Sequence, residues 1–179
     1  MVDEVRTNRQ LIEKVAEIYN WLDSQIRVSA DLAGQCKACG KCCDFEGFDH
    51  RLFVTPPEII YLAANLGAAL TAETAESTEK KKKNKNKIRR SDNTKNLGVI
   101  CELGGKRKMS RCPYNIDGKC IVYEYRFAGC RIFFCKADKD FQSELSESVL
   151  KKFKSLCRQF DIPYRYNDLA GALNGFATL

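Results

Sequence analysis

The sequence has no long apolar run, since no stretch approaches the ~18 apolar residues from which a membrane span is recognised. Its first 21 residues carry acids early and contain no apolar segment followed by a small-residue cleavage site. We therefore expect a cytoplasmic chain without a membrane span. In that compartment cysteine thiols stay reduced and are free to bind metal.

Histidine is nearly absent. The only one, His50, lies in the loop sequence EGFDH, close to Asp44, Glu46 and Asp49. One histidine among loop acids forms no recognised catalytic arrangement, so we predict a surface histidine, with a role as a replacement metal ligand as the alternative. No glycine-rich cofactor loop and no internal repeat is evident. Catalytic residues are therefore unknown, and whether the chain is an enzyme stays open.

Cysteine, in contrast, is abundant, with ten residues in a chain of 179. Such a content in a small exported protein would indicate disulfides, but this sequence shows no export signal. We therefore favour metal binding over a disulfide framework. The length suits a single domain with a core of its own, and we expect residues 1–179 to form one cysteine-cluster domain.

The net charge of +7 comes from one short run. Lys80–Arg90 (KKKKNKNKIRR) supplies eight cations, and without them 22 basic residues would face 23 acidic ones. We predict a flexible lysine-rich insertion over residues 71–96, because like charges repel and no apolar face orders them. A weak contact with nucleic acid or another polyanion is the alternative. No aromatic residue interleaves the run, so base stacking is not expected.

Three segments have helical periodicity. An amphipathic helix is predicted over residues 7–28, with Thr7 and Gln10 at capping-box spacing. A second is predicted within VTPPEIIYLAANLG, where Thr55 can cap the helix, Pro56 suits its first position and Glu58 lies three residues after the cap. The third is predicted over residues 144–160. The apolar stripe of the first helix is Leu11, Val15, Ile18, Leu22 and Ile26. That of the third helix is Leu145, Val149, Phe153, Leu156 and Phe160.

The cysteines form two clusters. The first is the C-x2-C-x2-C-C run of residues 36–43, and the second has gaps of seven, nine and four residues. A two-residue gap lets neighbouring thiolates converge on one metal, and glycine supplies the turn that this needs. The candidate ligands are Cys36, Cys39, Cys42, Cys43, Cys112, Cys120, Cys130 and Cys135. Their basic neighbours, which would offset thiolate charge, are Lys37, Lys41, Arg111 and Arg131.

The remaining cysteines have other predicted roles. Cys157 lies beside the stripe of the third helix, where a free cysteine behaves as a small hydrophobe. Cys101 follows the apolar sequence LGVI and is either a strand residue or a spare ligand. The adjacent pair Cys42 and Cys43 should have different tasks, because neighbouring side chains diverge. The aromatic residues of the second cluster should exclude water from the metal; they are Tyr123, Tyr125, Phe127, Phe133 and Phe134.

The ordered motifs CKACGKCC, VTPPEI, CPY, GKCIVYEYR and GCRIFFC resemble those of the YkgJ-type cysteine-cluster family, which is described as a zinc- or iron-chelating domain. The resemblance covers about residues 36–135, interrupted by the lysine-rich insertion. It implies that the eight candidate cysteines named above hold a metal. Family members usually carry a proline where this chain has Phe127, which we expect to alter one turn and remove no ligand. A related domain accompanies an iron–sulfur cluster in a flagellin lysine methylase, which favours iron–sulfur here.

We therefore predict a mainly α domain with irregular cysteine-rich loops, whose helices enclose a metal–thiolate site. The expected function is that of an iron–sulfur ([4Fe–4S]) protein with a redox or electron-transfer role and an unknown redox or protein partner. The alternative is a structural Zn²⁺ module for protein or nucleic-acid interaction. Which of Cys42 and Cys43 serves which site is left open.

Overall fold

The computed structural model describes residues 2–34, 40–47, 52–66, 110–133 and 136–176. This part of the chain is mainly helical, as predicted. The lysine-rich insertion predicted over residues 71–96 lies outside the described residues. Within the described residues, no helix combines the length and the apolar character that crossing a membrane requires.

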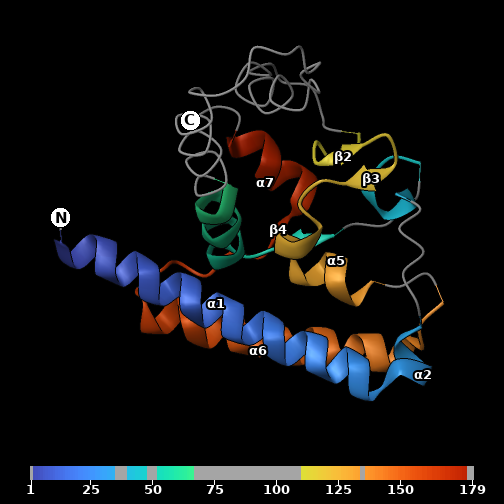
Figure 1. Cartoon of the computed structure of the whole chain (residues 1–179), viewed down its shortest axis with the longest axis horizontal. Coiled ribbons are helices and arrows are strands. Elements are labelled where there is room, and N and C mark those ends of the chain that lie inside the picture. The colour runs from blue at the N-terminus through green and yellow to red at the C-terminus, as the bar shows by residue number, and fades with distance from the viewer. Residues whose placement is uncertain (1, 35–39, 48–51, 67–109, 134–135, 177–179) are drawn as a thin grey trace, which may run out of the picture.

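Two long helices form the base of the molecule (Figure 1). They are α1 (Val2–Val28) and α6 (Lys139–Gln159), joined at one end by the short helix α2 (Ala30–Ala33), where the Asp138 amide donates to the Leu32 carbonyl at 2.8 Å. The five-residue helix α5 (Ala128–Ile132) packs against both long helices. The predicted end of the first helix at residue 28 is confirmed.

The starts of both long helices differ from the prediction. Helix α1 begins at Val2, so Thr7 and Gln10 stand inside it and form no capping box. Helix α6 begins at Lys139 rather than at residue 144, because the Asp138 carboxylate accepts the Phe141 amide at 2.9 Å and caps the helix there. Phe141, in the first turn of α6 and four residues before Leu145, packs against the hydrophobic core and extends the predicted stripe toward the N-terminus.

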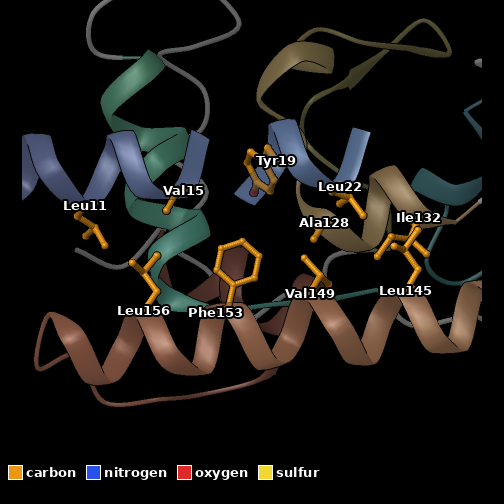
Figure 2. Close-up of a cluster of buried hydrophobic side chains, with 10 residues drawn as sticks. All are labelled: Leu11, Val15, Tyr19, Leu22, Ala128, Ile132, Leu145, Val149, Phe153 and Leu156. Carbon is orange, nitrogen blue, oxygen red and sulfur yellow. The ribbon is translucent and has the colours of Figure 1, made fainter. Parts of the chain in front are cut away.

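The first hydrophobic core fills the space between α1, α5 and α6 (Figure 2). Phe153 is fully buried near its centre, with its ring 6.0 Å from that of Tyr19 in an edge-to-face arrangement. The predicted stripes supply most of this core, as Leu11, Val15, Leu22, Leu145, Val149, Phe153 and Leu156 are buried. Cys157 is 1% exposed on the same helix, which confirms its predicted place in the core.

A second, smaller core lies above the first. It is enclosed by the two-stranded sheet of β1 (Phe53–Val54) and β4 (Asn167–Asp168), by the 56–66 helix, and by α7 (Leu169–Phe176). The strands are antiparallel, with Phe53 opposite Asp168. Its buried residues are Leu52, Val54, Leu62, Val122, Phe127, Leu169 and Leu173. Val122 and Phe127 come from the cysteine-rich segment, so this core connects that segment to the helices.

The cysteine-rich segments use short elements. They are the 3₁₀ helix η1 (Lys41–Cys43), the hairpin of β2 (Asn115–Ile116) and β3 (Lys119–Cys120), and the 3₁₀ helix η4 (Tyr123–Tyr125). The NIDGK turn closes the hairpin with Asp117 at φ 51° and Gly118 at φ 79°, the left-handed pair that a two-residue hairpin loop needs. Phe127 has φ −64°, so the backbone at this position has a conformation that a proline could also adopt.

Candidate metal centre

The two cysteine clusters meet through their backbones. The Cys112 amide donates to the Cys43 carbonyl at 2.7 Å, and the Phe45 amide donates to the Ser110 carbonyl at 2.8 Å. Arg111 and Asp44 form a bridge of antiparallel pairing, and their side chains form an ion pair at 3.5 Å. These contacts join segments almost 70 residues apart in the sequence, and they place Cys42 and Cys43 beside the second cluster.

Five cysteines line one cavity of about 60 Å³, and they are Cys42, Cys43, Cys112, Cys120 and Cys130. They come from η1, from the turn before the hairpin, from β3 and from α5. The apolar part of the wall includes Val122 and Phe127, both buried. Tyr123 also lines the cavity but stays 46% exposed, so it shields the site less than we predicted.

Gly40 and Asn115 close one side of this cavity. Gly40 has φ +70°, and a Cβ there would lie 2.8 Å from Asn115 Nδ2 and 3.0 Å from the Gly118 carbonyl oxygen. Only glycine therefore permits the first cluster to approach the hairpin this closely. Gly34, two residues before the first cysteine of that cluster, also has positive φ, at +69°.

The thiols of Cys43 and Cys112 are paired. Hydrogen bonds from the Cys112 and Cys42 thiols lower the pKa of Cys43 to about 3, assisted by Asn115 and by the charge of Arg111. The pKa of Cys112 is raised, because its thiol donates to Cys43 and is desolvated. Among the described cysteines, the Cys43 sulfur thus accepts hydrogen bonds from the thiols of Cys42 and Cys112. Thiolate character is what both a metal ligand and a reactive cysteine require.

Cys130 has a different environment. Burial is the main cause that raises its pKa to about 12, and the nearby thiols of Cys43 and Cys120 act in the same direction. Arg126 opposes this shift by its charge. Cys130 therefore holds its proton firmly unless a cation replaces it.

Two nitrogen donors at the cavity wall stand out. Asn115 Nδ2 and Arg126 Nε are buried and have no hydrogen-bond partner of ordinary geometry among the described residues. The Arg126 guanidinium also stacks on the Tyr123 ring, with Cζ 4.0 Å from its centroid. Sequence reasoning missed both residues, although Asn115 follows Cys112 by three residues and Arg126 precedes Cys130 by four.

Arg131 does not face the thiols, contrary to the prediction that it would offset their charge. Its guanidinium donates to Asp23 Oδ2 at 2.8 Å, to the Arg126 carbonyl at 2.9 Å and to the Glu124 carbonyl, and the side chain is buried. The charge near Cys130 comes from Arg126 instead. Asp44 forms an ion pair with Arg111 and accepts the Gly47 amide.

The structure describes only part of the predicted ligand set. Cys36, Cys39 and Cys135 lie outside the described residues, as do Cys101, His50, Asp49, Lys37 and Phe134. Cys42 and Cys43 line the same cavity, which the argument from diverging side chains did not predict. In the part of the chain that the structure describes, no group of three or more Cys, His, Asp or Glu side chains is arranged to hold a metal ion.

Comparison of the chain with protein-family models, with curated proteins and with solved structures found no match.

Proposed function

We propose that this chain is a metal-binding cysteine-cluster protein, with an iron–sulfur cluster in a redox or electron-transfer role as the favoured form. The observation that carries the proposal is the single cavity lined by five cysteines from four elements of two distant segments. Cytoplasmic proteins rarely gather thiols in this way without a metal or a redox reaction to serve. The resemblance to a cysteine-cluster family, which rests on the quoted motifs alone, agrees with this.

The chemistry of the cavity wall supports a metal–thiolate group. Sulfur donors suit zinc and iron–sulfur clusters, and a bound cation would replace the proton that Cys43 and Cys112 now share. The unpartnered N–H groups of Asn115 and Arg126 would be satisfied by a thiolate or sulfide, and such hydrogen bonds tune a cluster's potential. Both donors would otherwise be buried at a cost in free energy.

The described cysteines line the cavity without standing in ligating positions. We propose that ligation draws the thiols of Cys43, Cys112, Cys120 and Cys130 inward. Cys42, and on the sequence spacing Cys36, Cys39 and Cys135, are the further candidates. Five thiols are more than one zinc or one [4Fe–4S] cluster requires, since each takes four, so one cysteine is a spare thiol or serves a second site.

When bound, an iron–sulfur group would supply one-electron chemistry. The chain's own residues would set the conditions for it. Val122 and Phe127 exclude water, Arg126 offsets thiolate charge beside Cys130, and the unpartnered Asn115 amide would donate to a bound sulfur. Burial and hydrogen bonding to sulfur are the two means by which a protein sets such a potential.

A structural zinc site is the second candidate, and the size of the cavity favours it. A volume of about 60 Å³ is roughly twice the share of one water molecule in the liquid, so it suits a single ion better than four irons and four sulfides. In that case Cys42 and one or more other cysteines would be spare thiols.

Purification without oxygen, followed by analysis of iron, zinc and acid-labile sulfide, tests both candidates. A brown protein with iron and sulfide in equal amounts supports the cluster, and a colourless protein with one zinc supports the alternative. Cys112→Ser and Cys130→Ser should lose the metal, whereas Cys157→Ala, which removes a core thiol outside the cavity, should keep it. Wild-type protein that holds neither metal would refute the proposal.

A further inference from the structure

The segment that carries Arg126 and Cys130 has little regular structure of its own. It consists of the three-residue η4 and the five-residue α5, joined at Arg126 and Phe127. A helix of five residues does not persist by itself, because nucleation is unfavourable and few of its hydrogen bonds are internal. The placement of Cys130 at the cavity therefore depends on contacts from elsewhere in the fold.

Glu58 supplies one such contact. It is 2% exposed at the start of the 56–66 helix, and its Oε1 accepts the Ala128 amide at 2.7 Å, which caps α5 from another helix. Its Oε2 accepts both the amide and the hydroxyl of Thr55, at 2.8 and 2.7 Å, and Tyr19 donates to Oε1 at 3.3 Å. Through this carboxylate the Ala128 amide at the start of α5 is connected to Tyr19 of α1 and to the first turn of the 56–66 helix.

Arg131 supplies the second contact. Its three nitrogens donate to the carbonyls of Glu124 and Arg126, which precede α5, and to Asp23 on α1. The guanidinium also stacks on Tyr19, with Cζ 4.3 Å from the ring centroid. One side chain therefore fixes the bend between η4 and α5 and attaches it to the long helix. Cys130 and Arg126, which line the cavity, lie inside this bend.

We propose that Glu58 and Arg131 are positioning residues, which hold the bend of residues 124–131 so that Cys130 and Arg126 face the cysteine cavity. The inference rests on the proposed metal site, since it assigns Cys130 as a ligand. It differs from a general contribution to stability in one respect. Loss of the Arg131 contacts should release Cys130 specifically, whereas an equal loss of core packing should not.

Arg131→Lys tests this directly, because lysine keeps the positive charge but reaches fewer of the three acceptors. Asp23→Ala is the milder variant, since it removes only the attachment to α1. The control is Val15→Ala, a fully buried position on the side of Tyr19 away from Ala128 and Ile132 (Figure 2). Variants are compared at denaturant concentrations that give them the same free energy of unfolding.

The first readout is the rate at which a maleimide alkylates Cys130 in metal-free protein, measured by mass spectrometry relative to Cys157 in the same molecule. Arg131→Lys should raise this ratio roughly tenfold or more, because charge-assisted hydrogen bonds that keep the bend closed are lost. Asp23→Ala should raise it less, and Val15→Ala should leave it unchanged. A ratio in Arg131→Lys no higher than in Val15→Ala would overturn the inference.

The second readout is retention of the metal of the wild-type protein against a competing chelator. Arg131→Lys should release metal faster than Val15→Ala of equal stability, and equal rates would contradict the positioning role at the metal site. If the wild-type protein holds no metal, the proposed function fails. The alkylation ratio then still decides whether Arg131 positions Cys130.

Discussion

Gly40 and Gly118 offer a matched pair of substitutions at the place where the two cysteine clusters meet. Both glycines have positive φ, at +70° and +79°. A Cβ at Gly40 would lie 2.8 Å from Asn115 Nδ2, 3.0 Å from the Gly118 carbonyl oxygen and 3.3 Å from the Gly118 Cα. A Cβ at Gly118 would meet nothing within 4 Å. Alanine therefore introduces backbone strain at both positions, but a steric overlap only at Gly40.

The magnitudes follow from these two terms. A residue with a Cβ in the left-handed region costs about 1–2 kcal/mol, and this is the whole effect expected for Gly118→Ala. Overlap in a packed site adds about 1–3 kcal/mol. The Asn115 amide can rotate away, but the Gly118 carbonyl belongs to the hairpin turn and has no such freedom. We call the cysteine-rich segments, residues 40–47 and 110–133, the cysteine half. Gly40→Ala should therefore lower the stability of this half by about 2–5 kcal/mol.

Hydrogen exchange is the suitable assay because it resolves local opening. The Cys112 amide, which donates to the Cys43 carbonyl, reports the joining of the clusters. Its opening free energy should fall markedly in Gly40→Ala and little in Gly118→Ala, while the fluorescence of Trp21 in α1 follows global unfolding in urea. Equal protection of the Cys112 amide in the two variants would refute the close approach of Gly40 to the hairpin.

Three further predictions concern the core, a buried acid and the insertion. Phe153→Ala should lower the free energy of unfolding by about 3–5 kcal/mol in urea titration, because Phe153 is fully buried and its removal leaves a cavity; a loss below about 1 kcal/mol would contradict its central place. Burial raises the pKa of Glu58 above its usual 4.5, so the folded state binds this proton more tightly and the resulting stability is lost as pH rises through the raised pKa. The free energy of unfolding of the wild type relative to Glu58→Gln should therefore fall as pH rises from about 4.5, and a difference that grows with pH would contradict the assignment. Deletion of residues 71–96 should leave the metal content unchanged, and loss of metal on deletion would show that the insertion belongs to the site.

Much of the helical half could be predicted because its signals are local. The stripe of Leu145, Val149 and Phe153 recurs at helical spacing, and burial follows from that periodicity. Thr55 and Glu58 stand at capping distance, and the structure shows their side chains bonded. The same capping pattern misled at Thr7 and Gln10, where helix α1 continues to Val2. A pair at the right spacing indicates a cap only where the chain before it leaves the helix.

The cysteine half was less predictable because its contacts join distant segments. Spacing named the thiols as candidates, and five of them do line one cavity. Spacing could not show that Arg131 pairs with Asp23 while Arg126 lies near Cys130. The bend between η4 and α5 sets these two directions, and cysteine spacing carries no information about that bend. Nor could spacing show that Cys42 and Cys43 line one cavity. The directions of these neighbouring side chains are set by the 3₁₀ helix η1, which the cysteine spacing does not predict.

The division of the fold into two halves explains why a few polar residues matter so much. Helices α1 and α6 bury a continuous apolar core, whereas the cysteine cavity is built from elements of two to five residues that bury little of their own. The geometry of the cavity therefore depends on three sets of bonds: the backbone pairing of Cys43 with Cys112, the hydrogen bond from the Ala128 amide to Glu58, and the hydrogen bonds of Arg131. A cation shared by thiols from both clusters would add a further link between the same segments, and its binding free energy would appear as stability of the cysteine half rather than of the helical core.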